Sequence, residues 1–161
     1  LDMIWLRDKG HDVTGVELSK IAVNDFFEEN RIAFETTHHP KMIEHSTDGL
    51  NLICGDFFDL NENDMERHHL VFDRAALIAL PEEMRPSYVT HLCEILPESV
   101  SILQVILTYP QDQMGGPPFS VPEDELLSLY ADQFDVSKLA EYDIFAENPK
   151  FRERGLSSLT E

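Results

Sequence analysis

The chain has 161 residues, and its 12 Lys and Arg against 31 Asp and Glu give a formal net charge of −19. This length suits one domain with a sizeable core. Such an acidic balance argues against nucleic acid as a partner, because binding relies on basic residues that neutralise phosphates. No apolar run approaches the roughly 20 residues of a membrane helix, so we expect no membrane partner. Cys54 and Cys93 lie in separate apolar segments, which indicates a reduced, cytoplasmic setting.

Apolar spacing, caps and turn residues predict helices and strands in alternation. In chain order, the expected elements are a helix over 1–9, a strand over 11–17, a helix over 20–30 capped by Ser19, a strand over 41–44 turned by Asp48-Gly49 into a strand over 50–54, a buried strand over 70–72, a helix over 82–96, a central strand over 100–109, a helix opened by a capping box over 120–123, and a strand over 136–145. This alternation is typical of an α/β fold with a mainly parallel sheet.

Acidic residues stand at the ends of three of these strands. Glu17 ends one strand, Asp56 and Phe57 follow the strand over 50–54, and Asp73-Arg74 ends the strand over 70–72. The carboxyl ends of neighbouring parallel strands meet at one edge, where α/β sheets bind ligands. A carboxylate there can accept a hydrogen bond from a ribose hydroxyl or an adenine amino group, and Phe57 can cover the base. We therefore expect one ligand to contact all three strand ends.

Each of these residues also has an ordinary structural interpretation. Asp73-Arg74 can be a surface ion pair, Asp56 a turn former, and Phe57 and Phe58 part of the core. Three acidic strand ends in succession favour a ligand site over these alternatives.

A Gly- and Pro-rich segment and a basic segment stand out in the second half of the chain. Residues 110–121 read PQDQMGGPPFSV, and the Gly-Gly-Pro-Pro tract excludes a helix or an inner strand. Long ordered loops in compact domains are often functional lids. Residues 148–154, NPKFRER, form a basic island in an acidic chain.

Histidine pairs offer a rival interpretation as a metal protein. His38-His39 and His68-His69 are adjacent in sequence, so their side chains point in different directions, and no HExxH or CxxC motif accompanies them. Cys54 is a poor candidate nucleophile, because it ends an apolar strand with no orienting histidine nearby in sequence.

Several sequence blocks resemble the thiopurine S-methyltransferase family, and in particular its bacterial branch. These blocks are LDMIWL, GHDVTGVELS, AV-FF, ICGDFFDL, FDRAALIALP-EMR, YP-MGGPPFSV and AENP-FRERGL. The resemblance implies a Rossmann-like, doubly wound, mainly parallel sheet with helices on both faces. It also implies a single methyltransferase domain over residues 1–161 that is truncated at both ends and lacks the first and the last strand of the fold.

The same resemblance implies an enzyme of the EC 2.1.1 class. It would transfer a methyl group from S-adenosyl-L-methionine to a small-molecule thiol, a thiopurine, or in some members a selenium or tellurium compound, and leave S-adenosyl-L-homocysteine. The full-length protein would be a monomer. A non-catalytic Rossmann-like binding module is the alternative.

Five residues match functional positions of the family. Glu17 matches the ribose-binding acid, and Asp56 and Phe57 match the adenine pocket. Arg74 matches an arginine that contacts the methionine part of the cofactor and lies near the acceptor. Arg152 falls near a second, substrate-facing arginine, with Arg154 as its rival. The resemblance thus implies Arg74 and Arg152 as catalytic residues.

Overall fold

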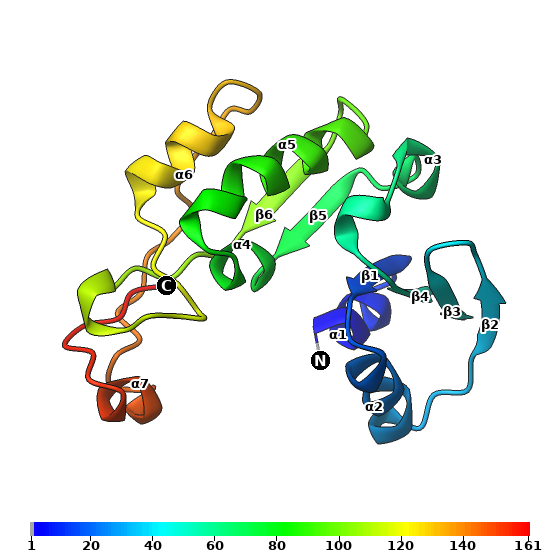
Figure 1. Ribbon diagram of the computed structural model, residues 1–161, viewed down its shortest axis with the longest axis horizontal. Helices are drawn as coiled ribbons and strands as arrows, with labels where there is room; N and C mark the ends of the chain where they lie inside the picture. Colours follow the sequence, from blue (N-terminus) through cyan, green and yellow to red (C-terminus); the bar gives the residue numbers. More distant parts are fainter. Residues whose placement is uncertain (1) are drawn as a thin grey trace. The chain divides into compact units, whose positions relative to one another are not determined.

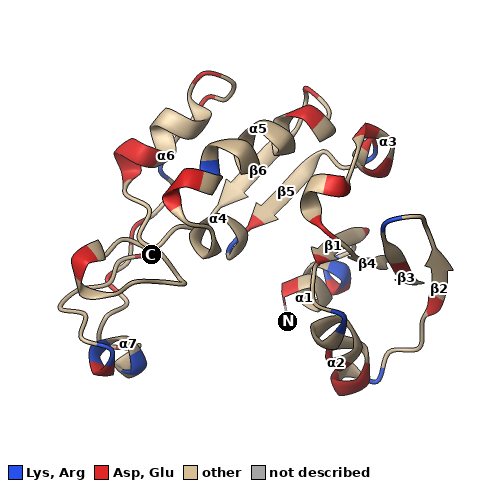
Figure 2. Cartoon of the chain, in the orientation of Figure 1, with Lys and Arg blue, Asp and Glu red and all other residues tan. Residues whose placement is uncertain are grey.

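The structure is a computed structural model that describes residues 2–161, and the chain divides into two compact units (Figure 1). Unit 1 is Leu1–Leu60 and unit 2 is Asn61–Glu161. The interpretation of the chain as one methyltransferase domain stays a prediction. Acidic residues are spread over both units (Figure 2), and no helix within residues 2–161 is long and apolar enough to cross a membrane.

The elements alternate much as expected. Unit 1 contains α1 (Asp2–Asp8), β1 (Val13–Glu17), α2 (Lys20–Asn30), β2 (Glu35–His38), β3 (Ile43–Thr47), β4 (Leu50–Cys54) and the short 3₁₀ helix η1 (Phe57–Asp59). Unit 2 contains α3 (Glu62–Met65), β5 (Leu70–Asp73), α4 (Ala76–Ala79), η2 (Glu82–Met84), α5 (Arg85–Ile95), β6 (Ser101–Gln104), η3 (Gln111–Gln113), α6 (Glu123–Tyr130) and α7 (Pro149–Glu153). The α/β class is confirmed.

The sheet of unit 1 has the strand order β1-β4-β3-β2. β1 pairs with β4 in parallel, whereas β4 with β3 and β3 with β2 are antiparallel. The Asp48-Gly49 hairpin is confirmed, with Gly49 at a φ of 68°. Because a two-residue turn can join only antiparallel strands, the expectation of a mainly parallel sheet is wrong for unit 1.

Helix α2 covers this sheet and closes the core of unit 1. Its N-cap is Ser19, as predicted, and the Ser19 hydroxyl accepts a hydrogen bond from the Ala22 N–H at 3.3 Å. Val23 and Phe27 are almost fully buried against Leu50, Leu52 and Cys54 of β4. This packing holds the strands whose ends carry Glu17 and Asp56.

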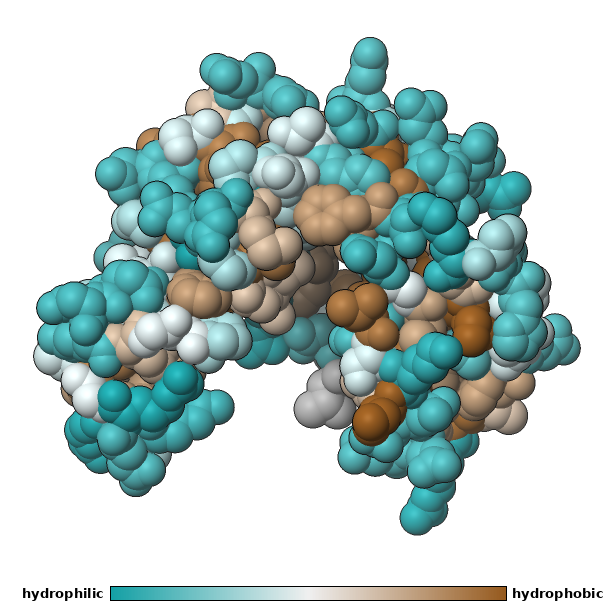
Figure 3. Space-filling view, viewed as in Figure 1, coloured by the Kyte–Doolittle hydropathy of each residue, from teal (hydrophilic) through white to brown (hydrophobic). Residues whose placement is uncertain are grey.

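Unit 2 has a two-stranded parallel sheet of β5 and β6, with Asp73 opposite Gln104. The prediction of a buried strand over 70–72 is wrong in part, because Leu70 and Phe72 are 65% and 39% exposed. Both side chains lie on the same face of the strand, and the described residues leave that face open. Apolar side chains are visible at the surface of both units (Figure 3).

The predicted central strand over 100–109 is shortened to β6. Val105 N still donates to Asp73 O of β5, but beyond Val105 the backbone pairs with other segments: Leu107 O accepts from Val121 N at 2.8 Å, and Thr108 bridges to Thr160. Among residues 2–161, β5 is the only strand that pairs with β6. The expectation of a central strand here is therefore wrong.

Two other local predictions fail for similar reasons. Residues 136–145 form no strand and only a single bridge, Asp143 with Thr160. The predicted capping box is absent, because the Ser120 hydroxyl accepts a hydrogen bond from the Tyr109 N–H at 3.0 Å and Pro122 takes the N-cap position of α6.

The loop over 110–121 is ordered by hydrogen bonds along its length. The Tyr109 hydroxyl donates to Pro118 O at 2.5 Å, and Gln111 Oε1 accepts from Ser120 N at 2.8 Å. Phe119 N donates to Ile78 O of α4 at 2.6 Å. These hydrogen bonds hold the loop backbone in a fixed position within unit 2.

Candidate functional site

Glu17 is the last residue of β1 and is half-buried. Its Oε1 accepts a hydrogen bond from the Ser19 N–H at 2.7 Å, which fixes the carboxylate at the turn into α2. No hydrogen bond within residues 2–161 engages Oε2. The carboxylate is thus oriented by one oxygen and has acceptor capacity on the other.

Asp56 lies at the same sheet edge as Glu17. The parallel register places Glu17 opposite Cys54, and Gly55 N donates to Glu17 O at 3.0 Å. Asp56 caps η1 by accepting a hydrogen bond from Phe58 N at 3.0 Å on Oδ1. The prediction that these two strand ends meet is confirmed within unit 1. The turn-former interpretation of Asp56 also holds, because one oxygen serves the turn.

Phe57 and Phe58 differ in burial. Phe57 is half-buried, and its ring packs edge-on against Phe58 with centroids 5.5 Å apart. Phe58 is 40% exposed, so its interpretation as a core residue is wrong. An aromatic pair therefore stands directly beside the Asp56 carboxylate.

Residues of the β2–β3 connection support this turn, and the sequence patterns did not reveal them. A Cβ on Gly55 would lie 2.9 Å from Met42 Cβ, so only glycine fits beneath that side chain. Lys41 Nζ donates to Asp59 of η1, and this hydrogen bond and the Asp59 charge raise the pKa of Lys41. No local sequence signal identifies either contact, since the partners are far apart in the chain.

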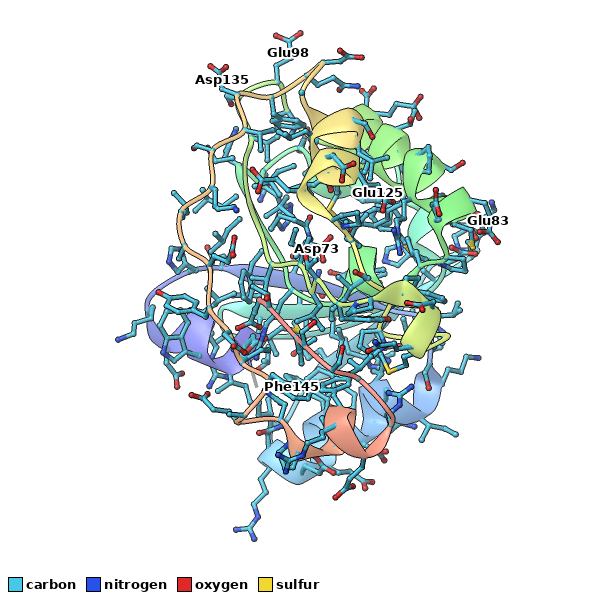
Figure 4. The ribbon with its side chains drawn as sticks, turned by 90° about the vertical axis from the view of Figure 1, so that its left-hand side faces the viewer. Asp73, Glu83, Glu98, Glu125, Asp135 and Phe145 are labelled. Atoms are coloured by element: carbon cyan, nitrogen blue, oxygen red, sulfur yellow. The ribbon has the colours of Figure 1, made fainter. Side chains whose placement is uncertain are left out.

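Asp73 and Arg74 end β5 in unit 2. Arg74 is exposed, whereas Asp73 is 4% exposed, so the interpretation of Asp73 as half of a surface ion pair is wrong. Figure 4 shows Asp73 inside unit 2, while Glu83 and Glu98 point outward. The Asp73 carboxylate instead accepts hydrogen bonds from Ala76 N and Leu77 N of α4 and from the Tyr88 hydroxyl of α5. No local signal in the sequence identifies Tyr88 as a partner, because it lies 15 positions away.

Arg152 and Arg154 flank the end of α7, and both are exposed. The Arg154 guanidinium lies 5.9 Å from the ring of the buried Phe151. Burial raises the pKa of Tyr109, and the nearby charges of Arg154 and Arg85 oppose that rise. Ser157 N donates to Gln113 Oε1 at 2.8 Å, so the segment that follows α7 lies beside the loop over 110–121. The assignment of the substrate-facing arginine to Arg152 stays a prediction.

The histidine pairs are engaged in ordinary contacts. His39 Nε2 lies 3.0 Å from Glu44 Oε2, and His69 Nδ1 lies 3.1 Å from Ser99 Oγ. Over residues 2–161, no group of three or more His, Cys, Asp or Glu side chains is arranged to hold a metal ion.

The predicted site residues fall into two sets. Glu17, Asp56 and Phe57 belong to unit 1, where the β1–β4 edge brings them together. Arg74 and Arg152 belong to unit 2. That one ligand contacts all three acidic strand ends stays a prediction.

Comparisons with known proteins place the whole chain in one family. The family model for thiopurine S-methyltransferase matches residues 1–161. The thiopurine S-methyltransferase of Nitrosospira multiformis is 45% identical over 160 residues, which cover 99% of this chain and 73% of that protein. Those of Marinobacter nauticus and Pseudomonas aeruginosa LESB58 are each 43% identical, over 96% and 100% of this chain and 71% and 74% of their own lengths. With its full length matched by the family model, this chain belongs to the thiopurine S-methyltransferase family.

Proposed function

We propose that Glu17, Asp56 and Phe57 bind the nucleoside part of S-adenosylmethionine, and that Arg74 and Arg152 serve methyl transfer to a thiopurine or another thiol. The family match over residues 1–161 supports the reaction class. The meeting of the Glu17 and Asp56 strand ends at the β1–β4 edge is the observation that carries the site.

The residues at this edge fit a nucleoside. Glu17 Oε1 is held by the Ser19 N–H, which aims the carboxylate and leaves Oε2 to accept from ribose hydroxyls. Asp56 is held in the same way through Phe58 N, which leaves Oδ2 for an adenine amino group. The half-buried Phe57 offers an aromatic face beside it.

The bound cofactor supplies an electrophilic methyl group on its sulfonium. The chain's residues then have to orient the acceptor sulfur and exclude water. A thiol with a pKa near 8.5 is partly ionised at neutral pH, so a strong general base is unnecessary. A guanidinium facing the sulfur, the role proposed for Arg152, favours the thiolate further.

Cofactor binding tests the role of Glu17. We expect Glu17→Gln to weaken S-adenosylhomocysteine binding to the intact enzyme by about 10- to 100-fold, because a hydrogen bond to a charged group contributes roughly 1.5–3 kcal/mol. Calorimetric titration measures the affinity. Asp12→Asn is the matched control, since it removes a carboxylate just before the opposite end of β1. It should leave the affinity unchanged.

Unchanged affinity in Glu17→Gln would remove Glu17 from the binding site. Methyl transfer from labelled cofactor separates an enzyme from a binding module, because a module binds S-adenosylhomocysteine but methylates nothing. A panel of thiopurines, aliphatic thiols, selenite and tellurite identifies the acceptor class.

The charge of Arg152 is tested with acceptors of graded thiol pKa. A cation close to a thiol lowers its pKa by roughly 1–3 units. We therefore expect Arg152→Ala to slow methylation by about tenfold or more for thiols whose pKa lies well above the assay pH, and less for those already ionised. Arg152→Lys should rescue only in part, because it keeps the charge but loses the planar fork.

Arg154→Ala is the matched comparison, since Arg154 is a second exposed arginine beside α7. An equal loss for all acceptors in Arg152→Ala would show that the residue does not tune thiol ionisation. The graded loss in Arg154→Ala alone would transfer the role to Arg154.

A further inference from the structure

A buried carboxylate stands directly before Arg74. Asp73 Oδ2 accepts a hydrogen bond from the Tyr88 hydroxyl of α5 at 2.9 Å, and Tyr88 is 6% exposed. Asp73 Oδ1 accepts from Ala76 N at 2.9 Å and from Leu77 N at 3.4 Å. Among the described residues, Asp73 is the only acidic side chain that is buried. A charge in such a place needs all of these donors.

The tyrosine is a permanent donor in this arrangement. Burial raises the pKa of the Tyr88 hydroxyl far above its usual value, and the charge of Asp73 raises it further. Its proton therefore stays in place across the physiological pH range. The hydrogen bond to Oδ2 fixes the rotation of the carboxylate, and so also directs Oδ1 toward the first turn of α4.

Asp73 fixes the backbone on both sides of Arg74. Before Arg74, the Asp73 carbonyl accepts from Val105 N at 2.8 Å and from Gln104 Nε2 at 3.1 Å. After it, the Asp73 carboxylate holds Ala76 and Leu77 at the start of α4. Arg74 and Ala75 form a two-residue link between fixed ends, which restricts where the arginine side chain can reach.

We propose that Asp73 and Tyr88 are positioning residues for Arg74. Tyr88 orients the Asp73 carboxylate, and the carboxylate fixes the link from which the Arg74 guanidinium extends. The inference rests on the function proposed for Arg74 in methyl transfer. Removing the Tyr88 hydroxyl leaves Oδ2 buried without a donor, so the carboxylate has to turn away from α4 or draw in water, and the link loosens.

The test is a double-mutant cycle in the intact enzyme between Tyr88→Phe and Arg74→Met. The readouts are kcat and KM for a thiopurine acceptor, together with the thermal unfolding midpoint of every variant. A displacement of about 1 Å can cost roughly 100-fold in rate, so we expect Tyr88→Phe to lower kcat/KM by about 10- to 100-fold. In the Arg74→Met background the same change should have little further effect, because nothing remains to be positioned.

Val89→Ala is the matched control. Val89 is the neighbour of Tyr88 on α5 and is 3% exposed, and its apolar side chain makes no hydrogen bond to Asp73 or Gln104. It should lower the unfolding midpoint comparably but leave kcat/KM near the wild-type value. If Tyr88→Phe does not fold, Asp73→Ala replaces it in the cycle, because it removes the carboxylate through which Tyr88 acts on the start of α4.

The outcomes are distinct. Wild-type activity in Arg74→Met would overturn the function proposed for Arg74 and the positioning with it. A loss in Arg74→Met combined with equal effects of Tyr88→Phe in both backgrounds would overturn the positioning alone. An equal loss of kcat/KM in Val89→Ala would likewise show that the effect is general to the core of unit 2.

Discussion

Replacing Arg85 with methionine is expected to lower the free energy of unfolding of unit 2 by about 3–5 kcal/mol, because breaking a buried ion pair leaves its partner uncompensated. The Arg85 side chain is 2% exposed. Its Nη1 donates to both carboxylate oxygens of Glu125 at 2.6 and 2.7 Å. Nε donates to Leu80 O at 3.0 Å, and Nη2 donates to Ser120 O at 3.2 Å.

These contacts join three separate segments through one guanidinium. Leu80 follows α4, Ser120 belongs to the loop over 110–121, and Glu125 lies in the first turn of α6. Methionine fills similar space but satisfies none of the three acceptors. We therefore expect the loop and α6 to lose the contacts that Arg85 makes with both of them. Chemical denaturation followed by far-UV circular dichroism measures the resulting loss of unfolding free energy.

Lys138→Met is the control for losing a cation that bridges acids. Lys138 Nζ contacts Glu123 and Glu141 at 2.6 Å, but in an exposed setting where screening removes most of the benefit. It should change the unfolding free energy little. Adding Glu125→Leu to Arg85→Met should recover part of the loss, because the orphaned charge is then gone. Equal stabilities of Arg85→Met and Lys138→Met would contradict the interpretation.

The second large effect is expected in the core of unit 1. Phe27→Ala should cost about 3–5 kcal/mol of unfolding free energy, the range observed when a buried aromatic residue is truncated and a cavity remains. Phe27 is 2% exposed, and its ring lies 4.2 Å from that of Phe34 and 5.2 Å from that of Phe26. The loss should appear in chemical denaturation of the intact enzyme.

Ile21→Ala is the matched control on the same helix, because Ile21 is 72% exposed. An exposed substitution of this kind should stay within about 0.5 kcal/mol of the wild type. Phe27→Ala should also weaken S-adenosylhomocysteine binding, since α2 packs on the strands that end in Glu17 and Cys54. Similar costs for the two variants would show that α2 does not anchor this core.

The sequence predicted the features that depend on neighbouring residues. Ser19 caps α2 and Asp48-Gly49 turns the hairpin, each through a signal within a few positions. The acidic residues at the strand ends were predicted from the same kind of short-range pattern. Family membership was also readable, because the motif blocks are contiguous and the family model matches the full chain.

Burial was harder to predict, because it depends on which distant segments supply a cover. The apolar run over 70–72 looked buried, yet Leu70 is mostly exposed, since hydrophobicity says nothing about what packs against a strand. The interpretation of Phe58 as a core residue was wrong for the same reason. Conversely, the sequence offered Asp73 as a ligand contact or as half of a surface ion pair, and neither alternative foresaw its burial beside Tyr88, 15 positions away.

The sequence by itself thus determined the α/β alternation, the family and the residues at the strand ends, because each rests on local chemistry or contiguous motifs. Only the tertiary structure decided where β6 ends, that the Ser120 hydroxyl serves Tyr109 and no helix cap, and that Arg85 and Asp73 are buried. These outcomes turn on competition for hydrogen-bond partners. A donor or acceptor takes whichever partner folding brings within about 3 Å, and sequence distance does not rank those partners.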